Sequence, residues 1–311
     1  MVPSPRQLPA VLADALRKGP FDAALDSAIQ VSGLSLDRIR HRLALRGVDV
    51  SVTTLSYWRR GRSRPERPRS RQAVRLLEEL LELPADSLVS LIGPRRPRGR
   101  WTSQDRAVLD TEHLWQGYES LPGLLGDLDP TGDGLTRLAA HDRFELDADG
   151  AETSCRTTLV LRAERERVDR CVIITRGDDP GRLPAVDDVR NARRGRVRTD
   201  LGVPLVVTEL LLDRILSRGE TAVIDYTLTY ASSGTRSHEC GRAFRAAASL
   251  YTLEVSFSPA AVPVRCHHGS GVSESHRLAD LKPVWISNAG HAHLVVQDPT
   301  PGFQWMRWEW A

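Results

Sequence analysis

Apolar and polar positions follow two different periods along this chain, and the change of period divides it. In residues 21–31 the apolar side chains of Phe21, Leu25, Ala28 and Ile29 fall three or four positions apart. That spacing predicts a helix with one buried face. Comparable spacing recurs in residues 36–46, 52–60, 72–83 and 84–92, and a short helix is expected near 8–17. The first part of the chain is therefore predicted to be a bundle of about five helices.

Serine and glycine residues mark the ends of these predicted helices. Ser35 and Ser51 stand directly before the second and third helices, where a serine side chain accepts hydrogen bonds from the first free amides of a helix. Gly47 and Gly61 follow the same two helices and are typical of helix ends. The boundaries of the second and third helices are thus predicted from both sides.

From about residue 152 the apolar positions alternate with a period of two. The alternation is clearest in residues 157–161, 222–230 and 251–257, which predicts half-buried strands. Further short strands are expected near 168–175, 204–212, 262–267, 283–287, 292–297 and 303–310. Many short strands separated by Gly, Pro and Ser predict a mainly antiparallel, β-sandwich-like domain.

These patterns predict an α+β protein with four parts. Residues 1–93 form the predicted helical domain, residues 94–100 an Arg/Pro linker, and residues 151–311 the β-rich domain for effector or dimerisation functions. Residues 101–150 are interpreted as a mixed connector, with a helix over 108–121 and a turn-rich stretch over 124–134.

Composition excludes several classes of protein. The 311 residues are 41% hydrophobic and include only four cysteines, which excludes a disulfide scaffold. No apolar run approaches the roughly 20 residues that a transmembrane helix needs, and residues 1–10 lack the apolar stretch of a secretory signal. We therefore expect a cytoplasmic protein without a membrane partner.

Positive charge is concentrated in the predicted helical domain. Residues 38–75 contain twelve arginines but only Asp49 and Glu66 as acidic residues, whereas acidic residues outnumber basic ones after residue 100. A compact basic segment beside an acidic remainder is typical of a nucleic-acid-binding module. A solvated arginine-rich surface is the alternative interpretation.

The most informative local motif lies in residues 50–65. Ser51 opens the predicted third helix, Leu55 and Trp58 share its buried face, and Gly61 ends it before a basic stretch that runs to Pro65. This block resembles the recognition-helix region of the Xre/Cro-type helix-turn-helix family of DNA-binding proteins. The resemblance covers about residues 20–93. Sixteen residues separate Ile39 from Leu55, more than in the compact family pattern, so the second helix is longer or a loop follows it.

The resemblance implies a recognition helix in the major groove of double-stranded DNA. It assigns base contacts to four residues near the start of that helix: Val52, Thr53, Ser56 and Tyr57. Phosphate contacts are assigned to four arginines at and beyond the helix end: Arg59, Arg60, Arg62 and Arg64.

Other groups of residues could bind metals or form an interface, but their spacing is less specific. His238, Cys240, Cys266 and His267, with His268 beside them, could supply zinc ligands if two strands brought them together, but their spacings are not those of a zinc finger. The acidic stretch 127–134 lacks the final Glu of a calcium loop. We predict no metal, no cofactor and no catalytic residue. The tryptophans of residues 303–310 either close the sheet or form a dimer surface.

Taken together, the sequence predicts a sequence-specific DNA-binding transcriptional regulator that is not an enzyme. Its β-rich domain would sense an unknown small-molecule or protein effector, or pair two chains into a homodimer. Two alternatives stay open: an enzyme with a DNA-targeting head, and a protein-interaction adaptor. The sequence does not identify an operator, an effector, or a choice between activation and repression.

Overall fold

The computed structural model contains helices first and strands afterwards, which confirms the predicted α+β class. It describes residues 8–92, 108–115, 118–128, 132–177, 183–200, 202–231, 235–272 and 281–311. The predicted linker 94–100 lies outside these residues. The chain divides into two compact units: a helical unit of Met1–Gly99 with Arg214–Glu220, and a β-rich unit of Arg100–Asp213 with Thr221–Ala311.

The helical unit contains five α-helices and one short 3-10 helix among its described residues. They are α1 (Ala10–Lys18), α2 (Phe21–Ser32), α3 (Leu36–Leu45), α4 (Val52–Arg59), α5 (Pro68–Leu80) and η1 (Val89–Ile92). The segment predicted as a helix over 84–92 forms only η1. Its start is held by the buried carboxylate of Glu78, which accepts hydrogen bonds from the amides of Asp86, Leu88 and Val89.

One apolar core holds the helical unit together. Leu25, Ile39, Leu55 and Leu77, from four different helices, are fully buried in it, and Trp58 joins them. Ser35 and Ser51 cap α3 and α4 by accepting from the amides of the third residue along, at 3.3 and 3.1 Å. The sixteen-residue spacing between Ile39 and Leu55 reflects a loop over residues 46–51, since α3 ends at Leu45.

The β-rich unit contains thirteen strands among its described residues, together with three short helices. The helices are α6 (Thr111–Leu114), α7 (Leu121–Leu125) and η2 (Gly126–Leu128). The strands are β1 (Leu135–Leu146), β2 (Glu152–Ala163), β3 (Val168–Arg176), β4 (Ala185–Arg190), β5 (Ala192–Asp200), β6 (Val203–Leu216), β7 (Thr221–Thr229), β8 (Glu239–Phe244), β9 (Leu250–Ser256), β10 (Arg265–Gly271), β11 (Lys282–Val284), β12 (His291–Gln297) and β13 (Gly302–Glu309).

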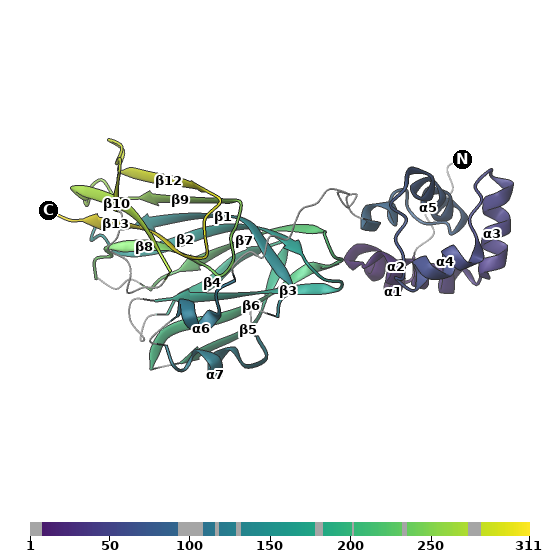
Figure 1. Cartoon of the computed structure of the whole chain (residues 1–311), viewed down its shortest axis with the longest axis horizontal. Coiled ribbons are helices and arrows are strands. Elements are labelled where there is room, and N and C mark those ends of the chain that lie inside the picture. The colour runs from purple at the N-terminus through teal and green to yellow at the C-terminus, as the bar shows by residue number, and fades with distance from the viewer. Residues whose placement is uncertain are drawn as a thin grey trace. The chain divides into compact units, whose positions relative to one another are not determined.

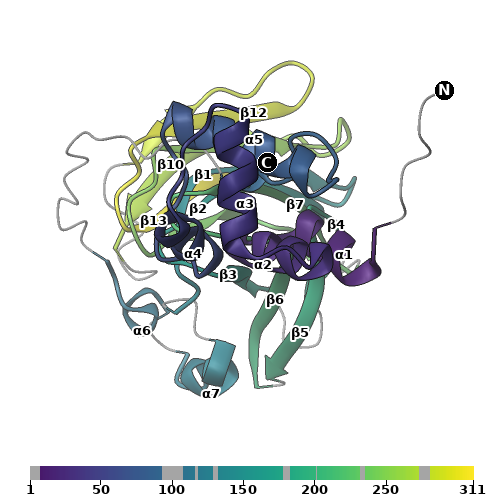
Figure 2. The ribbon, with the colours of Figure 1, turned by 90° about the vertical axis from the view of Figure 1, so that its right-hand side faces the viewer.

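Three sheets build this unit. The largest has the order β12-β9-β1-β2-β7-β4, the second β11-β10-β13-β8, and the third β3-β6-β5. Strands β1 and β9 pair in parallel. Antiparallel pairs join β1 to β2, β2 to β7, β7 to β4, β9 to β12, β10 to β11, β10 to β13, β13 to β8 and β5 to β6. Figures 1 and 2 both show α7 beside β5. There the Arg198 guanidinium donates to the Leu124 and Leu125 carbonyls at 3.1 and 2.6 Å.

Buried and less buried side chains alternate along strands β1 and β8, but each strand has one charged residue in its inward phase. On β1 Leu135 is buried, and from Ala140 onward the buried positions are Ala140, Asp142, Phe144 and Leu146, so one carboxylate occupies the apolar phase of the alternation. On β8 the corresponding phase contains Arg242. Polar residues in inward positions need partners when water is excluded, and Asp142 and Arg242 are partners of each other.

The structure differs from several sequence-based expectations. The helix expected over 108–121 is limited to α6. Strand β1 lies inside the segment interpreted as a connector, because Asp142 interrupts the apolar phase of its alternation. In the C-terminal strand Trp305 and Trp308 are buried, and the Trp308 indole donates to the Ser237 carbonyl at 2.8 Å. These two tryptophans pack within the unit and do not form an exposed dimer surface.

None of the described helices has the length and apolar character required to cross a bilayer.

Candidate functional site

The four predicted base-contacting residues of helix α4 differ in how far their side chains are exposed to solvent. Thr53 and Tyr57 are exposed, Tyr57 at 43%, whereas Val52 and Ser56 are half-buried. Leu55 forms the buried side of the same helix, as the pattern predicts. The outward face of α4 therefore presents the Thr53 hydroxyl and the larger Tyr57 ring.

The four predicted phosphate-contacting arginines are not equivalent. Arg59 pairs with the Asp26 carboxylate of α2, and the guanidinium of Arg64 lies 3.5 Å from the Leu91 carbonyl oxygen. Arg60 and Arg62 are exposed, and the Arg62 guanidinium lies 6.0 Å from the Tyr57 ring centroid. Two of the four side chains are therefore already engaged inside the unit, which sequence spacing alone did not reveal.

The candidate zinc ligands do not meet. Cys240 lies on β8 and Cys266 and His267 lie on β10, with β13 between the two strands. Strands separated by a third lie about 10 Å apart, too far for one metal ion. Within the described part of the chain, no group of three His, Cys, Asp or Glu residues is placed to hold a metal.

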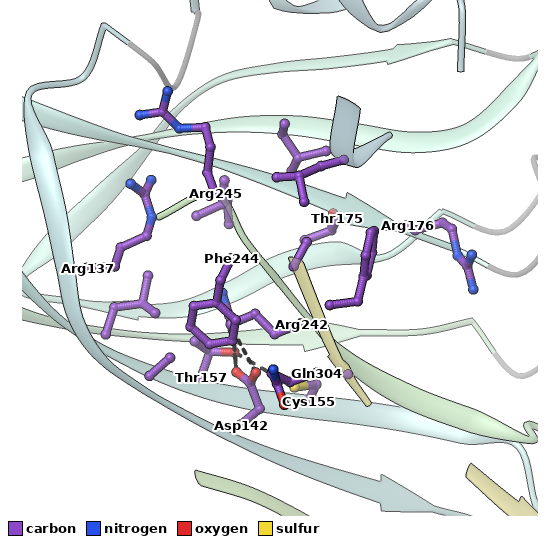
Figure 3. A pocket seen from close by; sticks show the side chains of 18 of the residues that line it. Arg137, Asp142, Cys155, Thr157, Thr175, Arg176, Arg242, Phe244, Arg245 and Gln304 are labelled. Atoms are coloured by element: carbon purple, nitrogen blue, oxygen red, sulfur yellow. Dashed lines mark hydrogen bonds and ion pairs between the residues drawn. The ribbon is translucent and has the colours of Figure 1, made fainter. Parts of the chain in front are cut away.

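The β-rich unit contains a pocket of about 440 Å³. Strands β1, β2 and β7 of the six-stranded sheet, β8 and β13 of the four-stranded sheet, β3 of the third sheet and helix α6 all contribute to its lining. Figure 3 shows Asp142, Thr157, Arg242 and Phe244 gathered at one side of the cavity, with Arg176 pointing away from them. A volume of this size is within the range that small organic ligands occupy.

Aromatic and aliphatic side chains form much of the pocket lining. Trp115 meets Phe303 edge to face with ring centroids 6.0 Å apart, and both line the cavity with Leu114, Phe244 and Trp305. Such rings supply a large apolar contact area with little conformational freedom to lose. The lining is therefore suited to the apolar part of a ligand.

A buried ion pair lies among these apolar residues. The Asp142 carboxylate accepts from Nε and Nη2 of Arg242, both at 2.7 Å, from the Thr157 hydroxyl at 2.7 Å and from the Tyr251 hydroxyl at 3.1 Å. Figure 3 shows the pair beside the Phe244 ring. A carboxylate with this many donors is held in one position and has little capacity left to abstract a proton.

Arg137, which also lines the pocket, forms a second ion pair with Asp133. The Nη2 of Arg137 donates to the Asp133 carboxylate and to the Val172 carbonyl, each at 2.9 Å. Burial alone would lower the pKa of the Arg137 guanidinium, but the Cys171 and Asp133 groups beside it raise that pKa above its ordinary value. Arg242 behaves in the same way, with Asp142 overcoming the effect of burial.

The two pocket-lining thiols are not activated. Burial raises the pKa of Cys155 and of Cys240 well above the ordinary value of a thiol. Because the thiolate is the nucleophilic form of cysteine, both side chains stay protonated and act as apolar lining. The chemistry that the pocket offers is therefore hydrogen bonding by arginines within an apolar surface.

Sequence analysis did not identify Arg137, Asp142 or Arg242 as site residues. They are single residues on strands far apart along the chain, and no short motif joins them. The available indication was their phase: Asp142 and Arg242 stand at positions where their strands otherwise bury apolar side chains.

Comparisons with known proteins give only distant similarities. No protein-family model and no curated protein matches the chain. Among solved structures, the chain is similar to an M1 zinc metallopeptidase from Deinococcus radiodurans, with TM-score 0.35 and 16% identity over 56% of this chain and 42% of that one. It is also similar to yeast LTA4 hydrolase bound to bestatin, with TM-score 0.32 and 7% identity over 57% of this chain and 29% of that one.

These comparisons correct the functional prediction. The similar structures are peptidase- and hydrolase-type proteins and not DNA-binding regulators, so the prediction of a DNA-binding transcriptional regulator is wrong. Similarity at this level, over less than half of either solved structure, carries no argument that this chain is itself a peptidase.

The residues present do not fit a zinc peptidase centre. A His-Glu-x-x-His motif on a helix supplies two zinc ligands and a general base in such enzymes. The one His-Glu pair of this sequence is His238-Glu239, and Arg242 stands where the second histidine would be. Glu239 and Arg242 also lie on strand β8 and not on a helix.

Proposed function

We propose that the β-rich unit is a ligand-binding module whose pocket takes a small organic molecule. The observation that carries this proposal is the pocket of about 440 Å³, lined by aromatic side chains and by Arg137 and Arg242, each of which pairs with a buried carboxylate. Concave sites with apolar lining and a few fixed polar groups are the usual form of small-molecule sites.

The proposed event is binding without bond breaking. Asp142 is saturated with hydrogen-bond donors, and the thiols of Cys155 and Cys240 stay protonated. The pocket therefore offers recognition groups and no activated nucleophile among its described residues. This effector-binding role was one of the open expectations for the β-rich part of the chain.

A thermal-shift screen tests the proposal. The full chain is heated with a panel of neutral, acidic and basic aromatic compounds while tryptophan emission is followed. A ligand present at 100 times its Kd stabilises the unit it binds by about 2.7 kcal/mol, which corresponds to about 5–10 °C for a unit of this size. A panel in which no compound shifts the transition of the β-rich unit would overturn the proposal.

A matched pair of variants localises the binding. Ala140 lines the pocket, so Ala140→Phe fills part of it, whereas Val223 is 45% exposed on the same sheet. Ala140→Phe is expected to lose the shift and Val223→Phe to keep it. Far-ultraviolet circular dichroism of both variants establishes that each one is folded.

The partners and family expected for the helical unit stay predictions. Its likeness to the Xre/Cro-type helix-turn-helix family is supported by the buried Leu55 and Trp58 of α4 and by the Ser51 cap. Double-stranded DNA and a second copy of the chain are the predicted partners, and the cytoplasm is the predicted location. Binding of duplex DNA that falls steeply as salt rises would support the first partner, and sedimentation of the full chain would test the second.

A further inference from the structure

Two arginines line the pocket with part of their donor capacity unused. Arg242 on β8 engages Nε and Nη2 with Asp142, Thr157 and Tyr226, and its Nη1 donates to no residue that the structure describes. Arg137 on β1 donates only through Nη2 to the residues that the structure describes, so its Nε and Nη1 have donor capacity left for a ligand. Guanidinium groups carry five donors in a planar fork that matches a carboxylate.

Each ion pair has its positive member nearer to the open space. The side chains of Asp133 and Asp142 are 1% and 2% exposed, whereas those of Arg137 and Arg242 are 26% and 19% exposed. The carboxylates thus lie behind the guanidinium groups. Although each pair is neutral, its exposed end is positive, so the surface facing the pocket favours a negatively charged group.

Arg137 on β1 and Arg242 on β8 both line the pocket, so an anion in the cavity meets positive charge from two strands. The low dielectric of a buried site strengthens the attraction between such an anion and each guanidinium group. Both arginines stay charged, because the neighbouring carboxylates keep their pKa values above the ordinary value.

The remaining charged residues of the lining do not reverse this polarity. Arg176 lies 3.6 Å from the Glu239 carboxylate, which also accepts from Arg307 at 2.8 Å. Glu152 accepts from the Ser237 hydroxyl at 2.9 Å, and Glu164 pairs with Arg162 at 2.9 Å. The acidic side chains of the lining therefore have donors of their own.

We infer that the ligand of the pocket is an apolar carboxylate, whose carboxylate accepts from Arg137 and Arg242 while its apolar part lies against Trp115, Phe303 and Trp305. This inference rests on the proposed function and adds the chemical class of the ligand. A dianion such as a phosphate fits less well, since Asp142 and Asp133 already balance one positive charge each.

Matched pairs of probes test the chemical class. Phenylacetate, naphthylacetate and biphenylacetate are titrated into the full chain beside their primary amides, with tryptophan emission as the readout. Charge-assisted hydrogen bonds are about twice as strong as neutral ones, so we expect each carboxylate that binds to bind about tenfold more tightly than its amide. Arg137→Gln is expected to remove that preference, and Arg156→Gln, 47% exposed on β2, to leave it unchanged.

The outcomes separate the two proposals. Equal affinity of acids and amides for the wild-type chain, with both lost in Ala140→Phe, overturns the carboxylate assignment and leaves ligand binding standing. Binding of neither series overturns the carboxylate assignment, and the thermal-shift panel then decides whether ligand binding stands. If Arg137→Gln fails to fold, the ratio of acid to amide affinity in the wild-type chain decides the matter without it.

Discussion

Replacing Asp142 with Asn is the most demanding test of the polar cluster in the pocket. The carboxylate accepts four hydrogen bonds of 3.1 Å or less from Arg242, Thr157 and Tyr251. The amide keeps a similar shape but loses the negative charge, and its NH₂ group faces donors instead of acceptors. Arg242 would then be a buried cation without a counter-ion.

The size of the effect follows from the burial of the pair. Removing one partner of a buried ion pair costs about 3–5 kcal/mol, because the remaining charge stays desolvated. For a unit of this size each kcal/mol lowers Tm by about 2–4 °C. We therefore expect the β-rich unit of Asp142→Asn to melt about 10 °C below the wild type.

Tryptophan emission is a suitable assay, because six of the seven tryptophans lie after residue 100 and only Trp58 lies in the helical unit. Asp188→Asn is the matched control: Asp188 is 69% exposed and lies 3.8 Å from Arg156, so it should cost less than about 1 kcal/mol. The double variant Asp142→Leu/Arg242→Met should be more stable than Asp142→Asn. An Asp142→Asn protein that melts within 2 °C of Asp188→Asn would refute the reasoning.

Two further predictions concern stability elsewhere in the chain. Trp58→Ala should destabilise the helical unit by about 3–5 kcal/mol, since a buried indole is removed, whereas Tyr57→Ala should not; equal loss of helical circular dichroism on heating would contradict this. Hydrogen bonds from Arg196, opposed by partial burial, lower the pKa of Glu209 from 4.5 to about 2. Its folded pKa is depressed, so its stabilisation is present above pH 4.5 and is lost as pH falls towards 2. In Glu209→Gln the Tm of the β-rich unit should fall less as pH is lowered from 4.5 towards 2. An unchanged slope of Tm against pH would argue against the pairing with Arg170 and Arg196.

Local physics explains what could be predicted from the sequence in the helical unit. Ser35 and Ser51 cap their helices through their own side chains, and Leu55 and Trp58 are buried because their spacing places them on one face of α4. These interactions span a few residues and are visible as patterns. The pairing of Arg59 with Asp26 joins two helices, so no local pattern could reveal it.

In the β-rich unit most strands could be predicted, whereas β1, β4, β5, β8 and the site could not. A period of two indicates which face of a strand is buried, and Cys240 and Phe244 show it in the structure of β8. Arg242 breaks that pattern, yet its partner Asp142 lies 100 residues earlier, on a strand in another sheet. Which strands face one another depends on the whole topology, and periodicity carries no information about it.

Titration calorimetry with the most stabilising compound of the thermal-shift screen tests the central claim most directly. Wild-type chain should bind one molecule per chain with a negative heat-capacity change, because apolar surface is buried. Ala140→Phe, which narrows the pocket, should lose that binding, and Val223→Phe on the exposed face should retain it. Equal affinity in Ala140→Phe and the wild type would show that the ligand binds elsewhere and would contradict the account.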